Sequence, residues 1–177
     1  MTRCTGGEQR NDRLGWDEYL ANPEQLNACY DHVPELSGVR LRSVNVNWRG
    51  PQITLRIDLP RFPDHVSEEW RAEQVDTFQC HITFLAAEDI ALTDWRPPAT
   101  VDIALVPKEL RRVRVSVSGP GVDLRFSCSD SLLVGHVSAF KIAPDGADNG
   151  RHLFARRIDA RLYSELPATH ERRFYAE

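Results

Sequence analysis

The sequence predicts an α+β protein built mainly on an antiparallel β-sheet of about seven to eight strands in a meander, with short N-terminal helices and a weaker indication of a C-terminal helix. Three observations carry this prediction. Between residues 39 and 140, short segments alternate apolar and polar residues with the period of two that is typical of half-buried strands. Turn-forming Gly, Pro, Asn and Asp residues separate these segments. Before residue 39, apolar residues instead recur at spacings of three and four, which favours helices.

Length and composition indicate one domain, because 177 residues of which 41% are hydrophobic can bury a core without disulfide support. We expect a disordered segment over residues 1–13, a single domain over residues 14–142, and a linker with a C-terminal extension over residues 143–177. No apolar run approaches the ~18 residues that span a bilayer. The N-terminus also lacks the apolar stretch of a secretory signal, so the sequence predicts a cytoplasmic protein with no membrane partner.

Two short helices are predicted in the first 34 residues. The first begins near Leu14 and gathers its apolar residues on one face: Trp16, Tyr19 and Leu20. Asn22 is predicted to cap the second helix, with Pro23 at the first helical position. This helix carries an apolar stripe formed by Leu26, Cys29 and Tyr30. Pro34 ends it, because the residue before a proline disfavours helical backbone angles.

The clearest strand covers residues 52–59, where apolar and polar residues alternate without a break: Ile53, Leu55, Ile57 and Leu59 against Gln52, Thr54, Arg56 and Asp58. A strand over residues 39–48 precedes it, and its alternation changes phase, which indicates a bulge near Arg42–Ser43. Gly50–Pro51 is a turn, so the two strands are predicted to form a hairpin. One face of this hairpin is expected in the core, and the polar face is expected in solvent.

The remaining strands are predicted from the same alternation at residues 77–85, 90–95, 101–105, 113–117, 122–126 and 132–140. The last of these is apolar on both sides, which indicates a central or covered position. Residues 64–76 are interpreted as a crossing loop or one helical turn. Residues 151–166 satisfy neither period well, and a helix is slightly preferred there.

The sequence predicts no catalytic, cofactor-binding or metal site. It contains no GxSxG, GxGxxG or phosphate-binding loop motif, and its six histidines are scattered. The four cysteines form no CxxC pair that would hold zinc, and they are expected to be reduced residues, mostly in the core: Cys4, Cys29, Cys80 and Cys128. The net charge is -4, and no basic stripe studded with aromatic residues indicates nucleic-acid binding.

Acidic and aromatic residues are the candidates for contact with another protein. An acidic surface suits a basic partner, and an exposed tryptophan is a frequent binding hot spot. The candidate residues lie in charged loops and beside them: Glu68, Glu69, Trp70, Glu88, Asp89, Asp94 and Trp95. Taken singly, each is more often ordinary surface or core.

From Leu14 to Lys141, the order of these features resembles the immunity protein 50 family of bacterial polymorphic toxin systems. The matching features are Trp16 with Asn22–Pro23, residues 34–39, Gly50–Pro51 with residues 52–55, Leu59–Pro60, Phe62–Pro63, Trp70, residues 78–84, Trp95 and residues 119–122. The resemblance implies a small α+β protein without enzymatic activity that binds and neutralises a cognate toxin by stoichiometric occlusion. It carries over no catalytic residue and no cofactor. A nuclease is one candidate for the toxin, because nucleases are often basic.

Two other classes of function stay open at this stage. The first is a small-ligand-binding or enzymatic β-domain with a pocket near His81 and His136, which requires that the two imidazoles lie within ~10 Å and that a pocket of about 300 Å³ or more exists. The second is an adaptor that binds peptides along a sheet edge, which requires a long uncovered edge strand. Neither the identity of a partner nor the oligomeric state is predicted by the sequence.

Overall fold

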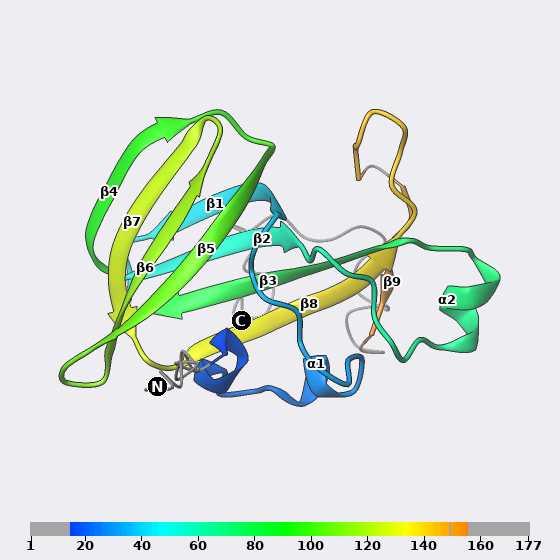
Figure 1. The fold of residues 1–177 in the computed structure, drawn as a ribbon, viewed down its shortest axis with the longest axis horizontal. Helices are drawn as coiled ribbons and strands as arrows, with labels where there is room; N and C mark the ends of the chain where they lie inside the picture. The colour runs from blue at the N-terminus through cyan, green and yellow to red at the C-terminus, as the bar shows by residue number, and fades with distance from the viewer. Residues whose placement is uncertain (1–14, 149, 156–177) are drawn as a thin grey trace, which may run out of the picture.

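The computed structural model describes residues 15–148 and 150–155, and these residues form one antiparallel sheet of nine strands (Figure 1). The strand order is β4-β7-β6-β5-β1-β2-β3-β8-β9. The predicted disorder of residues 1–13 and most of the predicted C-terminal helix lie outside the described residues.

The predicted strands are confirmed, and their bounds agree with the alternation of the sequence to within a few residues. The strands are β1 (Val39–Asn47), β2 (Gln52–Asp58), β3 (Thr77–Leu85), β4 (Glu88–Trp95), β5 (Ala99–Lys108), β6 (Arg112–Gly119), β7 (Val122–Ser129), β8 (Leu132–Phe140) and β9 (Leu153–Phe154). The helices are η1 (Trp16–Tyr19), α1 (Glu24–Asn27) and α2 (Glu68–Ala72). The protein is therefore mostly antiparallel sheet, and the helices of the described residues are minor.

The simple meander is only partly correct. β1, β2 and β3 pair in chain order, and so do β5, β6 and β7. β4, however, crosses from β3 to the far end of the sheet and pairs with β7, while β8 returns to pair with β3. Alternation shows which side chains of a strand are buried, but it does not show which strand lies next to it.

The sheet consists of two halves that face each other. β5 and β1 pair only over three residues each, and the half formed by β4, β7, β6 and β5 then crosses the other half at a steep angle (Figure 1). Phe84 of β3 packs edge-on against Phe126 of β7, with 5.1 Å between the ring centroids. The apolar faces of both halves therefore share one core.

The hairpin of β1 and β2 is confirmed, together with its bulge. The pairing register shifts between Leu41 and Ser43, which leaves Arg42 as the extra residue. A bulge turns its strand and re-aims a side chain. Here the Arg42 guanidinium reaches Asp58 on the polar face of the hairpin, at 2.5 Å.

The segments before β1 and between β2 and β3 contribute buried side chains to the core. Trp16 is buried and donates its indole N–H to the Pro34 carbonyl at 2.9 Å. The predicted cap at Asn22 is wrong, because its side-chain amide bonds the backbone of Val134 in β8 and leaves α1 uncapped.

The predicted reduced cysteines that lie in the described residues are free and buried: Cys29, Cys80 and Cys128.

Residues 143–155, for which the composition predicts a linker and an extension, pack on the sheet. Leu153–Phe154 forms β9 and pairs with β8. The slight helical preference for residues 151–166 is therefore wrong for this strand, and residues 156–166 lie outside the described residues. A strand of two residues is too short to show the alternation from which strands are predicted.

Candidate functional site

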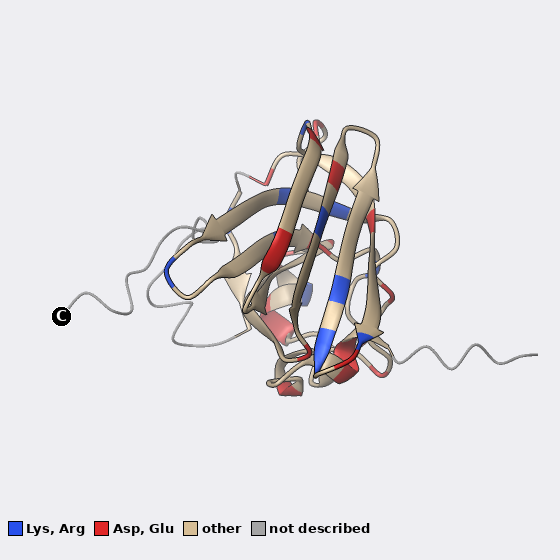
Figure 2. Cartoon of the chain, turned by 90° about the vertical axis from the view of Figure 1, so that its left-hand side faces the viewer, with Lys and Arg blue, Asp and Glu red and all other residues tan. Residues whose placement is uncertain are grey.

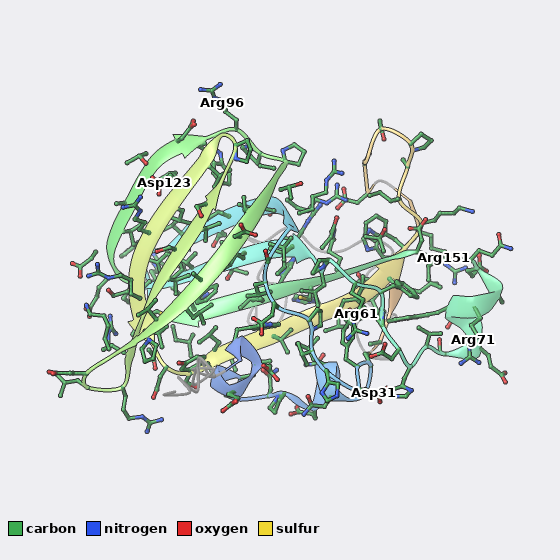
Figure 3. All side chains as sticks on the ribbon, in the orientation of Figure 1. Asp31, Arg61, Arg71, Arg96, Asp123 and Arg151 are labelled. Carbon is green, nitrogen blue, oxygen red and sulfur yellow. The ribbon has the colours of Figure 1, made fainter. Side chains whose placement is uncertain are left out.

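The seven candidate contact residues separate into two groups at opposite ends of the longest axis of the molecule (Figure 1). One group lies in α2: Glu68, Glu69 and Trp70. The other lies in β4: Glu88, Asp89, Asp94 and Trp95. In Figure 3, the labels of Arg71 and Arg151 mark the α2 end, and those of Arg96 and Asp123 mark the β4 end. These two acidic groups belong to different surfaces.

At the α2 end, the aromatic candidate is part of the core. Only 5% of the Trp70 surface is exposed, and its ring lies 6.1 Å from that of Phe78. The helix is capped by the Ser67 hydroxyl, which accepts the Trp70 backbone N–H. Arg151 lies 3.6 Å from the Glu69 carboxylate. This end therefore offers partly paired acids, without an exposed aromatic side chain from α2.

At the β4 end, apolar side chains on the core face of the sheet are exposed to solvent. β4 is an edge strand that pairs only with β7 among the described residues. Leu92 and Trp95 lie opposite Leu124 and Val122, which are buried core residues. Leu92 is nevertheless 50% exposed and Trp95 39% exposed, because no further strand of the described part of the chain covers them. Ile90 of the same strand is also exposed.

Two acidic side chains of β4 lie on the opposite face of the strand from Leu92 and Trp95. Glu88 and Asp94 lie opposite Ser127 and Asp123, on the outer face of the sheet. Each has a cation nearby: the partly buried Arg112 lies 2.8 Å from Glu88, and the exposed Arg96 lies 3.5 Å from Asp94. Asp89 has a left-handed backbone (φ 53°) at a register shift and forms no ion pair within the described residues. We call these six residues the β4 rim: Glu88, Asp89, Ile90, Leu92, Asp94 and Trp95.

The tip of the β1–β2 hairpin lies beside the start of β4, since the Pro51 carbonyl accepts the backbone N–H of Ala87 at 2.9 Å. Trp48 at this tip is 79% exposed, and the Arg49 guanidinium lies 4.9 Å from its ring centroid. Trp48 was not among the seven candidates. The signal that could have found it is its position at the turn, beyond the last residue of β1, where the core ends.

The polar face of the hairpin was expected in solvent, and at one end this expectation is wrong. Asp58 and Gln79 are buried there, and the Gln79 amide donates to the Asp58 carboxylate at 2.5 Å. Arg42 bonds Asp58 and also donates to the Gly146 carbonyl at 2.7 Å. Residues 145–148 and His152 therefore cover this face, held by a buried charged network.

Asp148 and His152 complete the buried network. Burial opposes ionisation of Asp148, but a hydrogen bond from Gln79 and the charges of Arg56 and Arg42 outweigh it, so its pKa lies below the ordinary value. Burial lowers the pKa of His152, whose ring bonds the Ser138 hydroxyl at 3.0 Å. The Asp58 and Asp148 carboxylates each have partners within the chain, although Gln79 Oε1 and Arg56 Nε are buried without a hydrogen bond. This pairing of buried charges indicates a structural role for the network.

His81 and His136 lie together, with 5.0 Å between the ring centroids. Burial, the second imidazole and the Arg56 charge lower the pKa of His81 to about 3, so this imidazole is neutral at pH 7. Pockets above 300 Å³ that are lined by described residues include one of about 310 Å³ beside Arg40 and residues 145–148, and one of about 650 Å³ between α1, α2 and Phe154. Neither His81 nor His136 is among the residues that line these pockets.

The described residues contain no group of three or more His, Cys, Asp or Glu side chains arranged to hold a metal ion. Within the same residues, no helix is long and apolar enough to cross a membrane. The surface feature that stands out is thus the β4 rim, which combines exposed apolar side chains, carboxylates and the edge of the sheet.

Comparison with known protein families gives one match. The family described as Immunity protein 50 matches residues 22–136, which is more than half of the chain. The chain belongs to the immunity protein 50 family. The resemblance seen in the order of motifs over residues 14–141 is thereby confirmed. Neither the curated proteins nor the solved structures gave a match.

The immunity protein 50 match extends from just before α1 into β8, so it includes both α2 and β4. Residues 145–148 and His152, which cover the polar face of the hairpin, lie beyond it. The family suggests an immunity protein with a toxin as its partner and a role that is not enzymatic.

Proposed function

We propose that this member of the immunity protein 50 family neutralises its cognate toxin by binding it stoichiometrically and covering its active or substrate-binding surface. The observation that carries this proposal is the β4 rim, where exposed apolar side chains on the core face of an edge strand lie beside carboxylates on its outer face. Protein interfaces have an apolar centre with aromatic residues and a polar margin. The rim supplies both kinds of side chain on a single strand, the apolar ones on its core face and the carboxylates on its outer face.

The β4 end suits an interface better than the α2 end does. The described residues include eight exposed large hydrophobic side chains, and five of them belong to the β4 rim or the hairpin tip: Val46, Trp48, Ile90, Leu92 and Trp95. Exposed aromatic side chains are enriched among interface hot spots, whereas a buried ring such as that of Trp70 reaches a partner only if the core opens. Glu68 and Glu69 remain the second candidate surface.

Charge would act mainly on the rate of association. The carboxylates of the β4 rim attract a basic toxin, and nucleases are frequently basic because they bind a polyanion. Steering of this kind raises the association rate and falls with ionic strength. The outer face of this half of the sheet carries both signs of charge, scattered over its strands (Figure 2), so the attraction comes from the rim and not from that whole face.

The test is co-expression with the toxin encoded beside the gene for this chain. Cells that produce the toxin should grow only when this chain is also produced, and the two purified proteins should form a 1:1 complex on size exclusion. Equal killing with and without this chain, together with no complex on mixing, would overturn the proposal.

Two matched double substitutions decide which end binds. Glu88→Gln with Asp94→Asn removes two charges at the β4 end, and Glu68→Gln with Glu69→Gln removes two at the α2 end. We expect the first pair to slow association about tenfold at low salt and the second to leave it within about twofold. The reverse result would move the binding surface to α2. Stopped-flow kinetics at two salt concentrations gives the measurement.

A further inference from the structure

We propose that β4 is the strand to which the toxin adds a strand of its own, and that the added segment alternates basic and apolar side chains. This inference rests on the proposed function and deepens it, because it names the backbone that the toxin contacts and the chemistry of the segment that contacts it.

The backbone of β4 is placed for such an addition. β4 is eight residues long and ends the sheet, with β7 as its one partner strand among the described residues. An edge strand presents a row of backbone N–H and C=O groups on its free side, and an extended segment can pair with them. Eight residues exceed the length of a typical strand, about five to six.

The side chains of β4 define what the added strand must carry. Leu92 and Trp95 point to the core face, where they are half-exposed, and Glu88 and Asp94 lie on the outer face. A neighbouring strand continues the same pleat, so its alternate side chains meet these two rows. Apolar residues on its core face would close the open end of the core. Lysine or arginine on its outer face would meet the carboxylates.

The same features disfavour a second copy of this chain as the occupant. If β4 paired with the β4 of another copy, the carboxylates of both strands would be brought onto one edge, and like charges on neighbouring strands destabilise a sheet. Charge therefore selects a basic partner.

Hydrogen exchange of the β4 amides tests the backbone pairing directly. The probe is the toxin encoded beside this gene, inactivated in its active site and added to the full chain. Exchange should slow at least about tenfold in the complex for those amides of residues 88–95 that point away from β7, because strand pairing closes N–H groups that otherwise face water. Amides of α2 should keep their free rate.

A matched pair of substitutions tests the side-chain pattern. Leu92→Lys places a positive charge on the core face of the rim, and Leu133→Lys makes the same change at a second partly exposed leucine, 38% exposed, in β8. Both variants should melt close to the parent chain. Leu92→Lys should weaken toxin binding at least about 30-fold, and Leu133→Lys should change it less than about threefold.

The outcomes separate this inference from the proposed function. If the toxin binds while β4 exchange is unchanged, strand addition is overturned and toxin neutralisation stands. Dimerisation of the chain alone with protected β4 amides would show that a second copy takes the edge, and would also overturn it. If no toxin complex forms and growth is not rescued, both proposals fail.

Discussion

Two regions of the molecule reverse the usual rule of burial. The β4 rim exposes apolar side chains, and the network around Arg42, Asp58 and Asp148 buries charged ones. At the rim, Leu92 and Trp95 continue the core face of the sheet into solvent. In the network, Arg42 and Asp58 belong to the polar face of the hairpin and are buried. The difference teaches that a charge removed from water needs a partner within the chain, whereas an apolar residue left in water is available to a partner outside it. Stability should therefore depend on the network, and binding on the rim.

The largest expected loss of stability comes from breaking the buried ion pair of Arg42 and Asp58. Asp58→Ala should lower the free energy of unfolding by about 3 kcal/mol or more, because it leaves the Arg42 guanidinium buried with weaker compensation. Urea denaturation measures this loss. Asp94→Ala is the control at the exposed end and should change stability by less than about 0.5 kcal/mol. Equal losses in the two variants would remove the contrast between the regions.

A substitution in the β4 rim should instead affect toxin binding more than the free energy of unfolding. Trp95→Ala should weaken toxin binding by about 2 kcal/mol, or about 30-fold, as truncation of an aromatic hot spot does. Its effect on the free energy of unfolding should be about 1 kcal/mol, since the ring is only partly covered. Calorimetric titration and urea denaturation of one protein preparation give both values. A large stability loss with unchanged affinity would make Trp95 a core residue and not a contact.

The pH dependence of stability sharpens the description of the polar face. His81 has a pKa of about 3 in the folded chain against an ordinary 6.5, so between these values the unfolded chain binds a proton that the folded chain does not. Stability should therefore fall by about 1.4 kcal/mol for each pH unit below 6.5 from this residue alone. His81→Gln should remove that share of the slope. Unfolding at pH 7, 6 and 5 measures it, and an unchanged slope in the variant would show that His81 does not titrate differently on folding.

The smallest effect is expected for an ion pair at the surface. Arg151→Ala removes the contacts of 3.6 Å to Glu69 and Glu73, where all three side chains are largely exposed. The free energy of unfolding should change by less than about 0.5 kcal/mol, because water already screens such pairs. A loss of several kcal/mol would mean that residues 145–155 are held by this pair more than by Arg42 and Asp58.

Much of the fold could be predicted because alternation is a local property. Phe78, Cys80, Ile82 and Phe84 recur every second residue, and β3 has the bounds that this pattern predicts. The site was predicted less well. Trp70 and Trp95 each stand next to acidic residues in the sequence, yet one is core and the other is half-exposed. A short charged segment looks the same in either case, because burial depends on what packs over it.

The amino-acid sequence by itself determined the antiparallel strands, the bulged hairpin and the family, since each depends on residues close together in the chain or on their order. Only the tertiary structure decided that β4 crosses to the edge beside β7 and that residues 145–148 fold over Asp58. Both are contacts between distant segments, and their free energy comes from surfaces that meet only after folding. That is why the open rim and the closed network appear in the structure and not in the pattern of residues.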